Sequence, residues 1–361
     1  MDATFWNGRR VFVTGHTGFK GSWLCLWLSE LQAVVAGYAL DPPTSPSLFE
    51  VANIKDVVHD FRGNINNLSL LSAEMQRFKP EIVFHLAAQP LVRYSYENPI
   101  ETLNTNIIGT GNLLEAVRSS PSVRAVIVIS TDKCYENKEW TWGYRETDPL
   151  GGYDPYSASK AAAELITACY RSSFFNRDCF KAHGVAIATA RAGNVLGGGD
   201  WALDRLVPDL LRSIAVGEPL ILRNPKSIRP WQHVLEPLNG YLLLAQKLIQ
   251  AGPEYGDSWN FGPDDLNTIS VVELVEKLMV ELGSSGNLEL DHATHPHEAN
   301  LLRLDTSKAR AKLGWRPILS IDRTISWLAK WARGYQSGQN MRALTVQQIV
   351  EYESLLGEHC K

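Results

Sequence analysis

Three glycines spaced three residues apart, Gly15, Gly18 and Gly21, follow the first apolar run of the chain. That run, residues 10–14, predicts a buried strand, and the apolar residues 22–31 predict a helix on the far side of the glycines. A strand that turns through glycines into a helix is the opening of a βαβ unit. The chain is therefore expected to begin with an α/β domain.

The alternation of short apolar runs and helices continues to about residue 190. Further strands are expected at residues 34–40, 81–86, 125–130 and 185–190, with helices at 112–119 and from Tyr156 onward. Short apolar runs separated by helices indicate a parallel sheet that is covered on both faces. The expected fold class is α/β, with a doubly wound parallel-sheet Rossmann domain.

A second, smaller domain is expected after Arg191, where short pieces interrupted by Pro and Gly replace the regular pattern. At roughly 150 residues per domain, a chain of 361 residues has about two domains. We expect the Rossmann domain over residues 1–190, with a return segment near 234–265. A mixed α/β C-terminal substrate domain is expected over 191–233 and 266–361.

The overall charge favours a small-molecule partner. The 35 Lys and Arg residues against 39 Asp and Glu residues give −4, so nothing global attracts nucleic acid or an anionic membrane. No stretch approaches the roughly 18 to 20 apolar residues of a membrane span, and the first residues lack the apolar centre of a signal peptide. The five cysteines form no CxxC pair, which predicts reduced thiols in the cytosol.

The glycine turn suits a dinucleotide, because bare backbone amides at a helix N-terminus can approach a pyrophosphate. Asp41 lies 20 residues past Gly21, at the end of the second predicted strand. A carboxylate there accepts hydrogen bonds from the adenosine ribose and repels a 2′-phosphate, so NAD is expected rather than NADP. The alternatives are a tight turn without ligand and, for Asp41, a turn carboxylate before two prolines.

Tyr156 and Lys160 share one face of a predicted helix, with Asp154 as its cap and Pro155 in its first turn. At this spacing the ammonium group can stabilise a phenolate, as can a nicotinamide cation, and so lower a pKa that is normally near 10. The pair could then deprotonate a sugar hydroxyl. The alternative is a surface tyrosine packed on a lysine stem.

The glycine turn, the Tyr156 and Lys160 pair and Ser130-Thr131-Asp132 together resemble the extended short-chain dehydrogenase/reductases that act on nucleotide sugars. Further matches are residues 63–65, the strand end 85–88, Asn106 at the start of a helix, and residues 191–195. In relatives, the position of Asn64 is usually occupied by an acidic residue. The resemblance implies NAD bound by Gly15, Thr17, Gly18, Phe19, Gly21, Asp41, Asn64, Ile65, Leu86, Ala87, Ala88, Asn106, Ser130, Tyr156 and Lys160.

Within that family the chain most resembles the 4,6-dehydratases, because Asp132 and Lys133 stand where epimerases carry small residues. The common dehydratase pattern has Glu at the position of Lys133. The resemblance implies CDP-glucose as substrate, with Thr131, Asp132, Lys133, Tyr156 and Lys160 as catalytic residues. Tyr156 would act at C4, Lys133 would remove the C5 proton, and Asp132 would protonate the leaving 6-hydroxyl. The alternative for Asp132 and Lys133 is an ion pair at the end of a strand.

Substrate binding is expected from arginines and amides near the ends of the strands. An arginine fork suits a diphosphate, and the alternative for each arginine is an ordinary surface ion pair. The resemblance implies a substrate site formed by Gln89, Thr131, Asn194, Arg205, Arg229 and Arg303. It also implies a homodimer or homotetramer through the helices that begin near Asn106 and Tyr156.

Other features allow other interpretations. Residues 291–298 contain three histidines and two carboxylates, but Pro296 breaks any helical presentation and the family chemistry needs no metal, so no metal is expected. Four tryptophans at helical spacing are expected to pack in the core, namely Trp23, Trp27, Trp327 and Trp331. A 4-epimerase, another nucleotide-sugar dehydratase, or a non-catalytic NAD-binding scaffold remains possible on the sequence.

Overall fold

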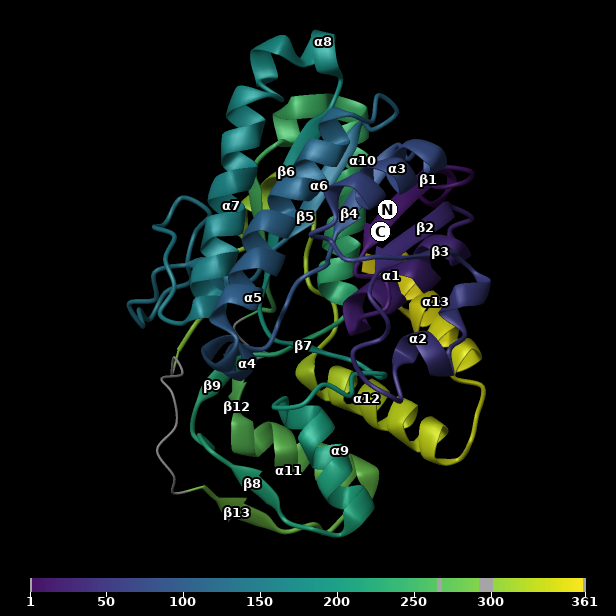
Figure 1. Cartoon of the computed structure of the whole chain (residues 1–361). Helices are drawn as coiled ribbons and strands as arrows, with labels where there is room; N and C mark the ends of the chain where they lie inside the picture. Colours follow the sequence, from purple (N-terminus) through teal and green to yellow (C-terminus); the bar gives the residue numbers. More distant parts are fainter. Residues whose placement is uncertain (1, 265–267, 292–300, 360–361) are drawn as a thin grey trace.

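A seven-stranded parallel sheet forms the centre of the computed structural model, which describes residues 2–264, 268–291 and 301–359 (Figure 1). Its strand order is β11-β6-β5-β4-β1-β2-β3. The strands are β1 (Arg10–Thr14), β2 (Val34–Ala39), β3 (His59–Arg62), β4 (Ile82–His85), β5 (Ala125–Ile129), β6 (Ala186–Ala192) and β11 (Ser258–Phe261). The expected doubly wound Rossmann sheet is confirmed. The short polar strand β3 and the edge strand β11 were not predicted.

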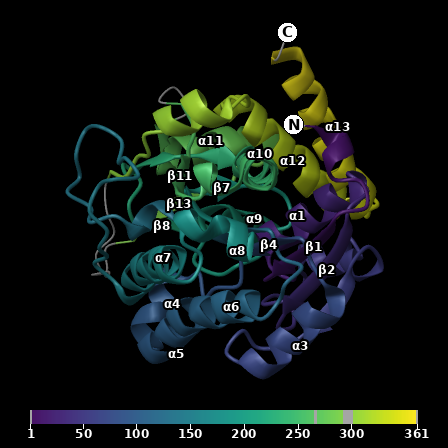
Figure 2. The same ribbon diagram turned by 90° about the horizontal axis from the view of Figure 1, so that it is seen from above.

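Alternate residues of each central strand enter two different cores, because neighbouring side chains of a strand point to opposite faces. In β1, Val11 and Val13 belong to one core, and Phe12 belongs to the other. Figure 2 shows α3 and α6 on one side of the strands, and α10, α12 and α13 on the other. The helices around the sheet are α1 (Phe19–Glu30), α2 (Leu48–Val51), α3 (Leu68–Phe78), α4 (Val92–Glu97), α5 (Pro99–Leu103), α6 (Gly109–Arg118), α7 (Pro155–Ser173), α8 (Phe180–His183), α10 (Leu235–Ala251), α12 (Ile321–Gln336) and α13 (Met341–His359).

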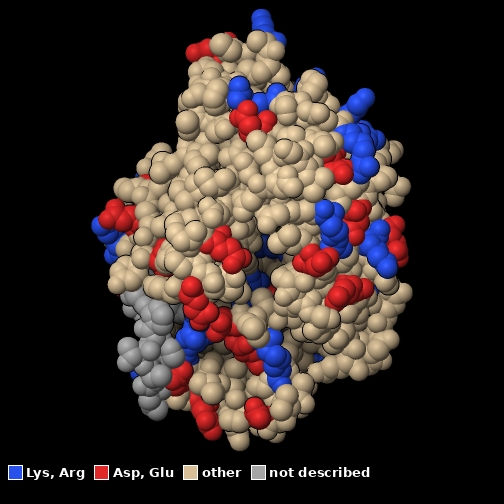
Figure 3. Space-filling model, viewed as in Figure 1, with Lys and Arg blue, Asp and Glu red and all other residues tan. Residues whose placement is uncertain are grey.

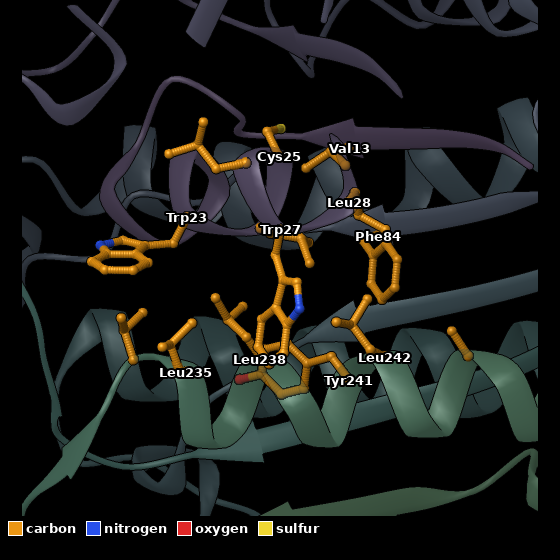
Figure 4. Close-up of a cluster of buried hydrophobic side chains, with 14 of the residues drawn as sticks. Val13, Trp23, Cys25, Trp27, Leu28, Phe84, Leu235, Leu238, Tyr241 and Leu242 are labelled. Carbon is orange, nitrogen blue, oxygen red and sulfur yellow. The ribbon is translucent and has the colours of Figure 1, made fainter. Parts of the chain in front are cut away.

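The core between α1 and α10 is built on tryptophan side chains (Figure 4). Trp23 and Trp27 of α1 are fully buried against Leu238 and Tyr241 of α10. Each indole N–H still finds an acceptor, the carbonyl of Gly198 at 2.9 Å for Trp23 and the carboxylate of Glu353 in α13 at 2.8 Å for Trp27. Trp327 and Trp331 of α12 are buried as well, so the packing role expected for all four is confirmed.

A smaller group of elements lies below the sheet in Figure 1. Its helices α9 and α11 share an apolar core with part of α12. The elements are α9 (Leu206–Val216), α11 (Val271–Leu282), β7 (Val195–Leu196), β8 (Leu220–Leu222), β9 (Ile228–Pro230), β10 (Gln232–His233), β12 (Thr268–Ser270) and β13 (Leu288–Leu290). The exact division into two domains stays a prediction, since α12 and α13 also contribute residues to the core beside α1. No helix among the described residues is long and apolar enough to cross a membrane.

Candidate active site

The glycine turn joins β1 to α1 in a conformation that two of its glycines require. Gly15 has φ of +73°, and a Cβ on it would lie 2.7 Å from the backbone nitrogen of Ala87. A Cβ on Gly21 would lie 2.2 Å from the carbonyl oxygen of Gly15. Since both contacts are with backbone, neither residue can carry a side chain without moving the turn.

Gly18 differs from Gly15 and Gly21, because the protein's own packing does not require a glycine at position 18. Its nearest contact from a built Cβ is 3.4 Å, and it caps α1 without a side-chain hydrogen bond. Thr17 donates from Oγ1 to the carbonyl of Leu40 at 3.0 Å, and Phe19 is the first residue of α1. The N-terminus of α1 therefore has no capping side chain, so its backbone can meet a ligand directly.

The ends of β2 and β3 bring the expected adenosine-side residues to one edge. The Asp41 side chain is 94% exposed and lies 3.7 Å from Nη1 of Arg62. The carbonyl of Asn64 accepts from the Tyr38 hydroxyl at 3.1 Å, and the carbonyl of Ile65 accepts from the Asn112 amide at 3.1 Å. The accessible carboxylate of Asp41 can accept hydrogen bonds from a ligand.

Residues 86–89 leave the carboxyl end of β4 and are held by Asn106. The Asn106 side chain accepts from the backbone N–H of Gln89 at 2.8 Å and donates to its carbonyl at 3.0 Å. The sequence suggested that Asn106 opens a helix, but it does not. It lies in a π-helical turn, Asn104–Ile108, between α5 and α6, because Pro99 already starts the helical run. The wider turn directs the buried Asn106 amide toward Gln89.

Helix α7 carries Tyr156 and Lys160 into the site. It begins as predicted, with the Asp154 carboxylate accepting from the backbone N–H of Ser157 at 2.9 Å and Pro155 in its first turn. Lys160 donates from Nζ to the carbonyl of Ile129, the last residue of β5, at 2.7 Å. Burial lowers the pKa of Lys160 to about 8 and raises the pKa of Tyr156 to about 12, while the Thr131 hydroxyl bonded to Tyr156 opposes that rise. A cation near the phenol is needed to make Tyr156 a base near neutral pH.

Asp132 is a buried carboxyl group in the short turn that follows β5. It is 3% exposed, and its Oδ1 accepts from the Thr131 hydroxyl at 2.9 Å. Burial raises the pKa of Asp132, although the charges of Lys133 and Arg229 oppose that rise. The environment therefore favours the protonated acid more than water does. Lys133, the next residue, is half-buried. Ser130, the residue that follows β5, is buried.

The structure places the substrate-site residues named from the sequence in different parts of the site. Arg303 lines a small pocket together with Gly193 and Pro230. Arg229 lies near enough to Asp132 to affect its pKa, and Arg205, which pairs with Asp200 at 2.8 Å, lies near enough to Tyr156 to affect the pKa of that phenol. Asn194 follows β6, and its carbonyl accepts from the N–H of Gln232 at 3.2 Å. Arg303 thus lines the pocket, Arg229 lies near Asp132, and Arg205 keeps its ion pair with Asp200 while lying near Tyr156.

Two residues near this pocket were missed by the sequence analysis. A Cβ on Gly193 would lie 2.8 Å from Oδ2 of Asp132, so this glycine makes room for the acid. Lys20, inside the glycine turn, has its pKa lowered to about 8 by burial and by Arg205, and it also feels Asp132. A lysine within a phosphate-binding type of turn was a visible signal, whereas the Gly193 contact joins residues distant in sequence. Figure 3 shows Lys or Arg side chains inside a hollow near the centre of one face.

The histidine-rich segment cannot be compared with its prediction, because residues 292–298 lie outside the described part of the chain. Within the described residues, no group of three or more His, Cys, Asp or Glu side chains is arranged to hold a metal ion.

Comparison with known proteins relates the whole chain to nucleotide-sugar enzymes. The family model described as GDP-mannose 4,6-dehydratase matches residues 12–327. A CDP-glucose 4,6-dehydratase of Salmonella typhimurium is 52% identical over 354 residues, which cover 98% of this chain and 99% of that protein.

Solved structures of two such enzymes share the fold. A UDP-glucose 4-epimerase of Thermus thermophilus in complex with NAD is 25% identical, with a TM-score of 0.76 over 90% of this chain and 99% of that one. A dTDP-glucose 4,6-dehydratase of Bacillus anthracis in complex with NAD is 23% identical, with a TM-score of 0.75 over 93% of this chain and 100% of that one. Since epimerases and dehydratases share this architecture, the fold alone does not separate the two reactions.

Proposed function

The chain belongs to the GDP-mannose 4,6-dehydratase family, and on that premise we propose that it is a lyase that converts CDP-glucose into CDP-4-dehydro-6-deoxyglucose and water. The 52% identity with a CDP-glucose 4,6-dehydratase extends over nearly the full length of both chains, which supports this substrate within the family. The local observation that carries the proposal is the buried carboxyl of Asp132, which lies near enough to Tyr156 to affect the pKa of that phenol. Water elimination needs an acid at the 6-hydroxyl, and epimerisation does not.

NAD is the cofactor of this reaction, and the glycine turn fits it. Gly15 and Gly21 hold the turn, and Gly18 leaves bare backbone at the start of α1, where a pyrophosphate can approach. We assign its binding to Gly15, Thr17, Gly18, Phe19, Gly21, Asp41, Asn64, Ile65, Leu86, Ala87, Ala88, Asn106, Ser130, Tyr156 and Lys160. When bound, NAD⁺ supplies an acceptor for the hydride of sugar C4 and later returns that hydride to C6.

Proton transfer at C4 belongs to Tyr156. Burial raises its pKa to about 12, so the phenolate form needs the ammonium of Lys160 on the same helical face. Lys160 also donates to the carbonyl of Ile129 at 2.7 Å, which fixes its ammonium at the carboxyl end of β5. Tyr156 then takes the proton of the 4-hydroxyl as C4 is oxidised to a ketone.

We assign the dehydration step to Asp132 and Lys133. The new ketone acidifies the C5 proton, and we assign its removal to Lys133. Asp132 gives its proton to the departing 6-hydroxyl, which leaves as water, and the raised pKa of this buried acid suits that role. A proton returns to C5 when C6 is reduced, so the complete reaction has no net redox change.

Substrate anchoring is assigned to Gln89, Thr131, Asn194, Arg205, Arg229 and Arg303. The diphosphate of the substrate requires cations, which is supported by Arg303 in the lining of the pocket and by Arg229 near Asp132. Arg205 can contribute only if it leaves or shares its ion pair with Asp200.

The test is product analysis of the purified protein incubated with NAD⁺ and, separately, with CDP-, dTDP-, UDP- and GDP-glucose. Mass spectrometry is expected to find the loss of one water from CDP-glucose and not from the other three. Conversion of a glucose to a galactose without change of mass would indicate an epimerase. Binding of NAD⁺ without any turnover would support a scaffold function instead.

We also propose a cytosolic location and a homodimer or homotetramer. Ile100, Ile108 and Leu165 are exposed apolar side chains on the run from α5 through the π-helical turn and on α7, which supports a contact between subunits there. Analytical ultracentrifugation of the protein and of Leu165→Glu tests this, because a monomeric wild-type protein would exclude it.

A further inference from the structure

A chain of buried hydrogen bonds crosses the carboxyl edge of the sheet, from the residue before Gly15 to the backbone of Tyr156. It consists of side chains from β1, β4, α6, the π-helical turn and α7. Its members are Thr14, His85, Thr110, Asn106 and Ser159, each at most 2% exposed.

The first half of the chain is centred on the His85 ring. The backbone N–H of Ala87 donates to Oγ1 of Thr14 at 3.2 Å, and that oxygen lies 2.7 Å from Nδ1 of His85. On the other side of the ring, Nε2 lies 3.1 Å from Oγ1 of Thr110, which donates to the carbonyl of Asn106 at 2.7 Å.

Only one direction of these bonds suits a neutral ring. The Asn106 carbonyl can only accept, so the single hydroxyl proton of Thr110 is used there, and Nε2 of His85 must carry a hydrogen to donate to Thr110. Nδ1 then has a lone pair, which accepts from the Thr14 hydroxyl. Burial and the nearby ammonium of Lys160 lower the pKa of His85 to about 3, so the ring is neutral at physiological pH.

The second half of the chain reaches the catalytic helix. The Asn106 amide donates to Oγ of Ser159 at 2.8 Å, and that hydroxyl donates to the carbonyl of Tyr156 at 2.7 Å. The same amide group holds both backbone groups of Gln89. Every bond in the series thus has a defined donor, and no member can turn without leaving a buried polar group unpaired.

We propose that His85 is a positioning residue, whose neutral Nε2–H imidazole holds the glycine turn and the helix of Tyr156 in one fixed arrangement. The assignment rests on the proposed function, because it takes the turn as the NAD site and Tyr156 as the base. Its consequence is that a hydroxyl on α6 affects both NAD⁺ binding and catalysis, although Thr110 belongs to neither assigned site. A phenylalanine of similar volume would fill the space but would leave both threonines without their partner.

The ring state is tested by nuclear magnetic resonance on protein labelled with ¹⁵N-histidine. His85 is identified as the signal that moves in Thr110→Val and not in Thr324→Val. Thr324 is the matched control, because it is also buried and makes the same hydroxyl bond to the carbonyl four residues earlier, but it lies in α12. We expect a protonated Nε2 and an unprotonated Nδ1 from about pH 6 to pH 8, since the ring titrates far below that range. A protonated Nδ1, a ring that titrates in this range, or no histidine signal specific to Thr110→Val would overturn the proposal.

The coupling is tested by a double-mutant cycle with Thr14→Val and Thr110→Val. Each change deletes one partner of the ring and is expected to weaken NAD⁺ binding and to lower kcat by about 5- to 10-fold, the size of one buried hydrogen bond. Once one threonine is replaced, the His85 ring no longer links the two sides. The double variant is therefore expected to bind NAD⁺ and turn over little worse than the worse single variant. Full multiplication of the two effects would contradict a link through His85. Because NAD⁺ binding and the ring state are measured without turnover, they are separable from a failure of the proposed dehydration.

Discussion

Replacing Gly193 by alanine should disable the acid of the dehydration step while leaving the protein folded. The added Cβ would lie 2.8 Å from Oδ2 of Asp132, against an ordinary contact of at least 3.4 Å. The carboxyl group must therefore retreat by about 0.6 Å, and a displacement approaching 1 Å can cost about 100-fold in rate. We expect kcat to fall by about 10- to 100-fold. Because the clash involves the end of a side chain, the free energy of unfolding should change by no more than about 1 kcal/mol.

The assay separates the two halves of the reaction. Single-turnover absorbance of the reduced nicotinamide reports oxidation at C4, and mass spectrometry reports loss of water. Gly193→Ala should retain NAD⁺ binding and C4 oxidation but lose dehydration, and adding Asp132→Asn should cause little further loss. The matched control is Gly111→Ala in α6, where an added Cβ meets nothing within 4 Å. An unchanged kcat in Gly193→Ala, or loss of C4 oxidation together with dehydration, would refute the reasoning.

Three further changes test other parts of the site and the core. Tyr156→Phe should reduce C4 oxidation by about 10²- to 10⁴-fold, with a much smaller loss of NAD⁺ affinity by equilibrium titration, and equal loss of both would contradict its role as base. Arg303→Lys should raise KM for CDP-glucose by about 10-fold with little effect on kcat, since a point charge replaces a fork; steady-state kinetics with the opposite pattern would exclude diphosphate binding. Burial raises the pKa of Glu236 to about 7 from 4.5, so the unfolded state ionises first and the contribution of this residue alone to stability should fall by about 3 kcal/mol as pH rises from 4.5 to 7, against the opposite contribution of the buried His85. Glu236→Gln should remove that loss in urea unfolding measured across this range, and the same pH dependence in both proteins would show that Glu236 is ionised when folded.

The central sheet and the start of the site were predictable because their signals are local. Apolar runs indicated β1 and β5, and the cap and proline before Tyr156 indicated the start of α7. These signals act within a few residues of each other, so periodicity and capping rules detect them. The expected NAD-type turn likewise depended on glycines within one short segment.

Contacts between distant segments were beyond the sequence. Gly193 faces Asp132 from another strand end, and only the packing of β5 beside β6 brings the two together. The π-helical turn at Asn106 was missed because its stabilising partners, Gln89 and Ser159, lie in other segments. The ion pair between Arg205 and Asp200 was also hidden, since a basic residue near the site looks the same whether it meets a ligand or a carboxylate.

The most direct test of the account follows the hydrogen at C4 of the substrate. CDP-glucose deuterated at C4 is incubated with the protein and NAD⁺, and the product is examined by mass spectrometry and nuclear magnetic resonance. Oxidation, dehydration and reduction within one active site predict that the deuterium is found at C6 of CDP-4-dehydro-6-deoxyglucose, with one water lost. Deuterium released to solvent or free cofactor, or retained at C4 of a product that has lost no water, would contradict the proposed reaction.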